Sequence, residues 1–308
     1  MMIIDDKIFP DFIIAGAQKC GSTSLAKWLD EHPDLVCSNP KEPKYFNSQE
    51  VCDANKGFAE FFSSDDLENS KLIFEATQMY MFDRDVAKRI KDVCGAGMKF
   101  IFIVKDPVAR AVSAYFHTFK YGNDLRDIED VFNFDGVSLD QIESVERQRV
   151  QEAIENGKII DIDRYSSYED SLLPFLYVSN SLYRTHLRRF VDLFGENNIL
   201  VLSLGSAKQN PRKFFDIVCN YIGVKNFVNL PDIDKKHNKT LVPRFMTIPY
   251  IRRRVLLIKI ARKITGFGVR IGLRSLLFMD KVKAPNHVLE KLEGLLTEEK
   301  EWVESLGN

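Results

Sequence analysis

Residues Phe12-Ile-Ile-Ala-Gly-Ala-Gln-Lys-Cys-Gly-Ser-Thr-Ser-Leu25 decide the fold of this chain. An apolar run ends at Gly16, a short loop carries Lys19 and Gly21, and a helical pattern begins at Ser24. A strand that passes through such a loop into a helix directs backbone N–H groups at an anion, and the helix dipole favours negative charge there. The stretch therefore predicts a binding site for a phosphorylated nucleotide.

The loop departs from the usual ATP and GTP pattern. That pattern is G-x-x-x-x-G-K-[ST], with the lysine directly after the second glycine. Gly16 and Gly21 have this spacing, but Ser22 stands where the lysine is expected, and the lysine of the loop is Lys19. The loop instead resembles the 5′-phosphosulfate loop of the sulfotransferases that use 3′-phosphoadenosine 5′-phosphosulfate (PAPS), above all the heparan-sulfate and bacterial carbohydrate enzymes. The resemblance implies that these loop residues bind the donor: Lys19, Cys20, Gly21, Ser22, Thr23 and Ser24.

A second segment carries the same resemblance. The apolar run 99–104 is short enough for a buried strand, and Pro107 suits the first turn of a following helix. In the sulfotransferases a basic residue after this strand and a serine eight positions later hold the 3′-phosphate, and Lys105 and Ser113 occupy these positions. Lysine replaces the usual arginine and lacks its planar fork, so we expect a less fixed grip on that phosphate. We expect Arg110 to be a solvated helix residue, with help to the 3′-phosphate as the alternative.

A third segment, Asn39-Pro-Lys-Glu-Pro-Lys-Tyr-Phe46, resembles the part of the carbohydrate sulfotransferases that carries the catalytic carboxylate, and Glu42 falls on that position. A hydroxyl acceptor must lose its proton as it attacks, and a glutamate can take that proton if burial raises its pKa. The alternative for Glu42 is a surface glutamate in a proline-rich loop. His117 is expected to have a packing or surface role. The resemblance also implies acceptor-side contacts: Lys44, Glu75 and Thr77.

The resemblance implies direct in-line transfer of a sulfuryl group from PAPS to a hydroxyl of a glycan or glycolipid, with the 3′,5′-bisphosphate PAP as product. Lys19 would stabilise the leaving phosphate oxygen. We expect no required metal, because the sequence has no His, Cys and Asp cluster with metal-ligand spacing. Two alternatives stay open. One is a P-loop kinase using ATP–Mg²⁺, with Asp106 on the metal; the other is a non-catalytic nucleotide-binding or membrane-surface module.

Composition indicates an ordinary globular protein. The chain has 308 residues, 45% of them hydrophobic, and a net charge of −1, which argues against a generally basic nucleic-acid binder. Its five cysteines include no C-x-x-C pair, which is typical of reduced thiols in the cytosol, and the loop position of Cys20 predicts a reactive thiol. The acidic N-terminus is no signal peptide, and no run of about 20 apolar residues exists. We expect a cytoplasmic, bacterial-type enzyme.

Alternating strand and helix patterns predict an α/β fold, a P-loop-like three-layer arrangement with a mainly parallel sheet between helices. Ligands of such folds bind at the carboxyl ends of the strands. We expect one sulfotransferase domain, 1–308, with these parts: a nucleotide-binding core at 10–121 and 178–245, a variable acceptor-side insertion at 122–177, and a basic helical cap at 246–308. A single closing helix is expected over 285–306.

Two C-terminal segments are basic. Residues 235–244 resemble the family's loop that closes over the nucleotide, with Asn238 and Arg244 as contacts; a solvated basic loop is the alternative. Residues 250–283 hold ten Lys and Arg and a single acid, Asp280. Such a segment can lie on an anionic membrane surface, here the inner face, or bind an acidic substrate, and the alternative is a cap with a solvated basic face.

Overall fold

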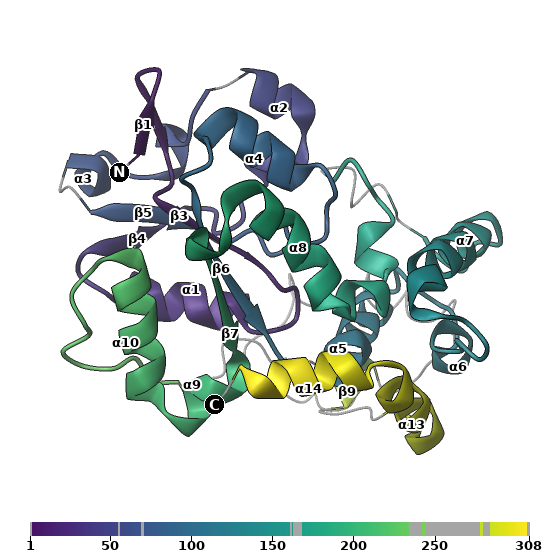
Figure 1. Ribbon diagram of the computed structural model, residues 1–308. Helices are drawn as coiled ribbons and strands as arrows, with labels where there is room; N and C mark the ends of the chain where they lie inside the picture. The colour runs from purple at the N-terminus through teal and green to yellow at the C-terminus, as the bar shows by residue number, and fades with distance from the viewer. Residues whose placement is uncertain are drawn as a thin grey trace, which may run out of the picture.

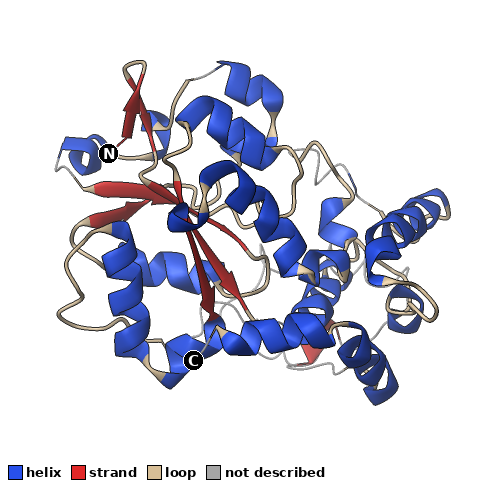
Figure 2. Cartoon of the chain, viewed as in Figure 1, coloured by secondary structure: helices blue, strands red, loops and turns tan. Residues whose placement is uncertain are grey.

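A five-stranded sheet forms the centre of the computed structural model, which describes residues 2–54, 56–68, 71–160, 162, 168–233, 242–243, 278–279 and 284–306. The strand order is β4-β5-β3-β6-β7, and all neighbouring strands of this sheet are parallel (Figures 1 and 2). Their bounds are β3 Phe12–Gly16, β4 Leu35–Cys37, β5 Leu72–Glu75, β6 Lys99–Val104 and β7 Ile199–Ser203. The predicted α/β fold with a parallel sheet is confirmed.

Helices cover both faces of the sheet (Figure 1). Because successive side chains of a strand point to opposite faces, the apolar residues of β3 and β6 divide between two cores. One core lies against α1 (Ser22–Asp30) and α10 (Pro211–Ile222) and takes Phe12, Ile14, Ile101 and Ile103. The other lies against α4 (Val86–Cys94) and α8 (Tyr183–Phe194) and takes Ile13, Ala15, Phe100 and Phe102. Because both faces of β3 and β6 are buried, apolar residues follow one another in these strands instead of alternating with polar ones, which explains the continuous apolar runs in the sequence.

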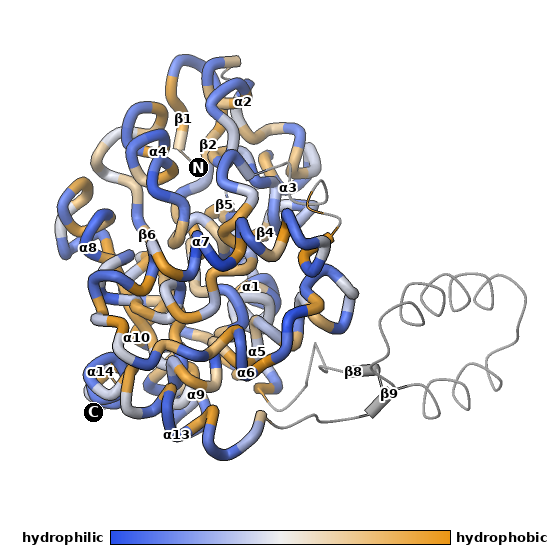
Figure 3. The backbone as a smooth tube through the Cα atoms, turned by 90° about the vertical axis from the view of Figure 1, so that its right-hand side faces the viewer, coloured by the Kyte–Doolittle hydropathy of each residue, from blue (hydrophilic) through white to orange (hydrophobic). Residues whose placement is uncertain are grey.

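The remaining elements surround this centre. Along the helices, hydrophobic and hydrophilic stretches of the tube alternate, as expected of helices with one buried face (Figure 3). The other helices are α2 Gln49–Ala54, α3 Ser64–Glu68, α5 Pro107–Lys120, α6 Ile128–Val131, α7 Ile142–Glu155, α9 Leu204–Gln209, α13 Asn286–Leu295 and α14 Thr297–Ser305. Two antiparallel pairs complete the described strands: β1 Met2–Ile4 with β2 Lys7–Phe9, and β8 Val242–Pro243 with β9 Phe278–Met279. No helix among the described residues is long and apolar enough to cross a bilayer.

The single closing helix that we expected is wrong. The chain turns at Leu296, which has φ −107° and ψ 19°, and this turn separates α13 from α14. The hydroxyl of Thr297 donates to the carbonyl of Glu293 at 2.7 Å, and nearby Gly294 has a low helix propensity. The turn lets both helices pack against α5. Sequence periodicity did not reveal the break, because the apolar spacing continues across it.

The carboxyl ends of β3, β5 and β6 lie at the same edge of the sheet, as parallel pairing requires. Three segments follow these ends: the loop after Gly16, the turn after Glu75, and Lys105 with the start of α5. The sequence had placed donor and acceptor residues in the same three segments. This edge is therefore where a candidate site is built.

Candidate active site

The loop between β3 and α1 ends in a glycine that the backbone requires. Gly21 is the N-cap of α1 and has φ 103°, a left-handed conformation that favours glycine. A Cβ there would also lie 3.0 Å from Cδ1 of Leu204. The first three amides of α1, those of Ser22, Thr23 and Ser24, have no carbonyl partner inside the helix. Such donors, at the positive end of a helix dipole, can bind an anion, and the anion site stays a prediction.

Arg110 lies behind this loop with no exposed surface. Its Nε donates to the carbonyl of Gln18 at 3.2 Å, one terminal nitrogen to Gln18 Oε1 at 3.3 Å, and the other to the carbonyl of Tyr177 at 2.9 Å. Its guanidinium also stacks 4.9 Å from the ring centroid of Phe82. The expectation of a solvated Arg110 was wrong, because α5 packs this side against the loop and protein oxygens replace water. A direct contact with phosphate is equally ruled out by this burial.

Several cations surround the partly buried Lys19. Burial, together with the nearby charges of Lys120, Lys105 and Arg110, lowers the pKa of Lys19 to about 8. Burial also lowers the pKa of Lys105. A lysine loses its proton more easily when its charge is desolvated and repelled by like charges. An anion bound here would relieve both costs, so the arrangement favours a ligand with several negative charges.

One face of α5 contributes three polar side chains to this region. Ser113, His117 and Lys120 are spaced so that they lie on the same side of the helix. The Nδ1 atom of His117 lies 3.4 Å from Nζ of Lys19. The half-buried ring of His117 also packs edge-on against Tyr121, with centroids 5.2 Å apart, as expected of a packing role. The contact with Lys19 was not predicted, and the position of His117 four residues after Ser113 was the signal that could have placed it. Ser113 and Lys105 are both partly exposed.

Asp106 does not suit the metal-binding role that a kinase would give it. Its carboxylate caps α5 and accepts a hydrogen bond from the backbone N–H of Ala109 at 2.6 Å. Within the described ranges, no three His, Cys, Asp or Glu side chains gather in a way that could hold a metal ion.

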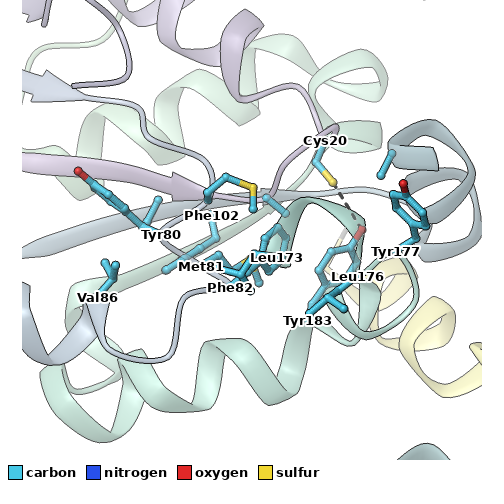
Figure 4. Close-up of a cluster of buried hydrophobic side chains, with 14 of the residues drawn as sticks. Cys20, Tyr80, Met81, Phe82, Val86, Phe102, Leu173, Leu176, Tyr177 and Tyr183 are labelled. Atoms are coloured by element: carbon cyan, nitrogen blue, oxygen red, sulfur yellow. Dashed lines mark hydrogen bonds between the residues drawn. The ribbon is translucent and has the colours of Figure 1, made fainter. Parts of the chain in front are cut away.

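Cys20 belongs to the core rather than to the anion-facing side of the loop. Its side chain is fully buried, and its Sγ lies 3.5 Å from the hydroxyl of Tyr183 (Figure 4). That hydroxyl donates to the carbonyl of Lys105 at 3.0 Å. Burial raises the pKa of the Cys20 thiol, so the expected reactive thiolate was wrong. Its backbone N–H donates to Ala17 at 3.2 Å and closes the loop on itself.

Glu42 lies beside the carboxyl end of β5. Its Oε1 pairs with Nζ of Lys41 at 2.7 Å, and 25% of its side chain is exposed. Lys41 also donates to the carbonyl of Ala76 at 2.9 Å. Lys44 follows in the same segment, and its Nζ lies 4.6 Å from the ring centroid of Tyr168. Glu42 is thus partly open to solvent rather than buried, and a substrate could reach it.

Glu75 and Thr77, expected as acceptor contacts, have no exposed surface. Oε2 of Glu75 accepts hydrogen bonds from the backbone N–H and the hydroxyl of Thr77, at 3.1 and 2.5 Å. Burial raises the pKa of Glu75 to about 7. Both side chains are enclosed by the protein, so an acceptor has no surface of theirs to touch here. The last two predicted contacts, Asn238 and Arg244, lie outside the described residues.

The sequence model of the sulfotransferase domain matches residues 9–238, which is most of the chain. The chain belongs to the sulfotransferase domain family. Human bifunctional heparan sulfate N-deacetylase/N-sulfotransferase 1 is 27% identical to this sulfotransferase over 226 residues. That match covers 72% of the chain but 23% of the human protein, so the chain spans about a quarter of its relative's length.

Two further proteins are similar to this sulfotransferase. The membrane-associated sulfotransferase kil1 of Dictyostelium discoideum is 29% identical over 158 residues, covering 49% of the chain and 33% of that protein. A crystal structure of a sulfotransferase from Alicyclobacillus acidocaldarius superposes with a TM-score of 0.49 and 22% identity. That superposition covers 80% of this chain and 89% of the other.

The role of Arg110 predicts a large loss of stability on a conservative change. Arg110→Lys cannot satisfy all three oxygens, and a buried acceptor left without a donor costs about 1–3 kcal/mol. Chemical denaturation should give a free energy of unfolding lower by about 3 kcal/mol. Arg188→Lys is the matched control, since that side chain is 83% exposed and should change little. Equal stability of the two variants would contradict the role of Arg110.

The pKa of Lys19 predicts pH-dependent anion binding. An anion holds the lysine protonated, so affinity for 3′,5′-adenosine bisphosphate should fall with rising pH above about 8, approaching tenfold per pH unit. Lys19→Arg stays charged and should show a much flatter profile between pH 7 and 9. Calorimetry on both proteins measures this, and parallel profiles would show that Lys19 does not bind the anion.

Proposed function

We propose that this sulfotransferase moves a sulfuryl group from PAPS to a hydroxyl of a carbohydrate or glycolipid. The observation that carries the proposal is the group of cations around the loop. Lys105 and Lys120 lie close enough to Lys19 for their charges to act on it, beside the amide donors of α1. PAPS carries anionic groups at both ends of its adenosine. This site concentrates positive charge in two neighbouring segments. Such a site suits a donor with anionic groups at both ends better than it suits a ligand with a single phosphate.

The segments divide between the two ends of the donor. The amides of Ser22, Thr23 and Ser24 and the ammonium of Lys19 would hold the 5′-phosphosulfate. Lys105 and Ser113 would hold the 3′-phosphate, with lysine acting as a point charge rather than a fork. Arg110 supports the loop at the 5′-phosphosulfate end from behind, through Gln18.

The transfer is a direct displacement at sulfur. The acceptor oxygen forms a bond to sulfur while the bond from sulfur to the bridging phosphate oxygen breaks, and that electron pair leaves with PAP. Glu42 takes the proton that the acceptor hydroxyl loses. Lys19 stabilises the negative charge that develops on the leaving oxygen. A sulfuryl group carries less charge than a phosphoryl group, so these protein cations can serve without a metal.

A glycan is the acceptor class that the relatives favour. The human protein named above is a heparan sulfate N-sulfotransferase, and this chain matches about a quarter of it. Glu42 is partly exposed, which leaves room for a bulky acceptor at the base. An assay with a glycan that has both free hydroxyls and free amines distinguishes transfer to oxygen from transfer to nitrogen, because the position of the sulfuryl group in the product shows which atom accepted it.

A thermal-shift screen tests the donor. 3′,5′-Adenosine bisphosphate should raise the melting temperature by several degrees, because a ligand that binds only the folded state stabilises it. ATP–Mg²⁺, ADP and GTP lack the 3′-phosphate and should give smaller shifts. Stabilisation by ATP–Mg²⁺ alone would favour a kinase instead.

Two substitutions test the chemistry. Lys19→Ala removes a preorganised donor to the leaving oxygen, which typically costs about 3–4 kcal/mol of transition-state stabilisation, so turnover of PAPS should fall at least about 100-fold. Glu42→Gln keeps the shape of the base but cannot take a proton, and it should lose turnover while still binding the bisphosphate. Circular dichroism checks that both remain folded. Normal turnover by either variant would remove that residue from the mechanism.

The placement of the enzyme in the cell stays a prediction from the sequence. We propose a cytoplasmic protein with peripheral contact to anionic lipid through residues 250–283, which lie outside the described residues apart from the backbone of 278–279. Sedimentation with anionic and with neutral vesicles, at low and high salt, tests it.

A further inference from the structure

The turn that follows β5, residues 76–81, is bonded to the donor loop. Oε1 of Gln78 accepts a hydrogen bond from the hydroxyl of Ser22 at 3.0 Å. The backbone N–H of Met81 donates to the carbonyl of Ala15 at 2.9 Å, just before the loop begins. A Cβ at Gly16 would lie 2.7 Å from Cβ of Met81, so the two backbones pack as closely as glycine allows. The turn and the donor loop therefore hold one another in place.

The same turn holds the segment that carries Glu42. The backbone N–H of Lys44 donates to Oγ1 of Thr77 at 3.3 Å, and that of Phe46 donates to the hydroxyl of Tyr80 at 3.1 Å. The N–H of Ala76 donates to the carbonyl of Lys41 at 3.0 Å. These bonds flank Glu42 on both sides. The position of the base relative to the donor loop is thus set through residues 76–81.

Glu75 lies at the root of this turn. Its carboxyl accepts both the N–H and the hydroxyl of Thr77, and the same hydroxyl oxygen accepts from Lys44. The groups that face Glu75 are Lys41, Tyr80, Cys37 and Cys94. Lys41, whose charge favours the ionised carboxyl, is also the ion-pair partner of Glu42. Glu75 is therefore connected through Thr77 to the segment that carries Glu42, and its charge also acts on Lys41.

We propose that Glu75 is a positioning residue for the transfer: it orients Thr77, and through Thr77 it fixes the segment that carries Glu42 beside the donor loop. The inference rests on the proposed function, in which Glu42 is the base. Glu75 itself has no exposed surface and touches neither donor nor acceptor. It acts through the geometry of the segment around Glu42 and not through the anion site.

Ionisation of Glu75 gives the inference a pH signature. Burial raises its pKa to about 7, so the carboxyl is charged at pH 8 and neutral at pH 5.5. A charged carboxylate accepts stronger hydrogen bonds than a neutral acid and attracts Lys41. Replacement by the neutral isostere glutamine should therefore matter at pH 8 and matter little at pH 5.5.

The test compares Glu75→Gln with the wild-type enzyme at both pH values. Hydrogen exchange of peptides covering 41–47 reports the amides of Lys44 and Phe46 directly. We expect exchange at pH 8 to be about tenfold faster in the variant, and the difference to shrink below about threefold at pH 5.5. Affinity for 3′,5′-adenosine bisphosphate should stay within about twofold, while kcat with a heparan oligosaccharide acceptor falls about tenfold at pH 8.

Two further variants make the test specific. Glu299→Gln is the matched control, because Glu299 is also buried but pairs with Arg184 on α8, and it should leave peptides 41–47 unchanged. Thr77→Val keeps the shape of the side chain and removes the hydroxyl between Glu75 and Lys44, so it should speed exchange at both pH values. If Glu75→Gln fails to fold, exchange of the same peptides in the wild-type enzyme relative to Thr77→Val should differ more at pH 8 than at pH 5.5, and an equal difference would overturn the role of Glu75.

The outcomes of these experiments test the positioning role of Glu75 and the proposed donor separately. Unchanged exchange at pH 8, or an equal difference at pH 5.5 and pH 8, would overturn the positioning role. So would a loss of bisphosphate affinity as large as the loss of kcat, since that would mark general damage. If wild-type enzyme fails to bind the bisphosphate, the proposed donor is wrong, whatever the exchange data say.

Discussion

Arg110 fixes the loop on which the rest of the site depends. Its guanidinium lies inside the protein and donates to two oxygens of Gln18 and to the carbonyl of Tyr177. Lys19, directly after Gln18, has φ 69°, a conformation that costs a non-glycine residue about 1 kcal/mol or more and persists only when its surroundings impose it. The bonds from Arg110 supply that constraint. They also place a permanent positive charge behind the loop, which no change of pH near neutrality removes.

The cost of this arrangement is repulsion among cations. Desolvation and the charges of neighbouring basic groups both make protonated Lys19 less favourable, as its lowered pKa reflects. The protein tolerates this because an anionic ligand reverses both effects on binding. A family of enzymes that transfers a charged group between molecules has a direct use for such a site. The cations that attract an anionic donor can also stabilise the negative charge that develops on the leaving oxygen when its bond to sulfur breaks.

Few residues join the loop after β3 to the segment of Glu42, the two parts that the proposed reaction assigns to donor and acceptor. The turn after β5 bonds to the donor loop through Gln78 and Met81, and to the segment of Glu42 through Thr77 and Tyr80. Its own strand, β5, lies next to β3 in the sheet. A transfer reaction needs the base and the reacting group at a fixed distance, and misplacement of about 1 Å can cost on the order of 100-fold in rate. Hydrogen bonds across adjacent strand ends meet that need with rigid backbone.

The sequence by itself determined the fold class, the order of its central strands along the chain, the loop between β3 and α1 and the family. These follow from local patterns: apolar runs such as 99–104, the glycines at 16 and 21, and the proline that starts α5. Tertiary structure alone decided which side chains meet. It buried Arg110, turned Cys20 into the core, brought His117 to Lys19, and enclosed Glu75. These contacts could not be predicted from local sequence patterns, because the direction of a side chain depends on neighbours from distant segments. Those neighbours come together only when the sheet and helices pack.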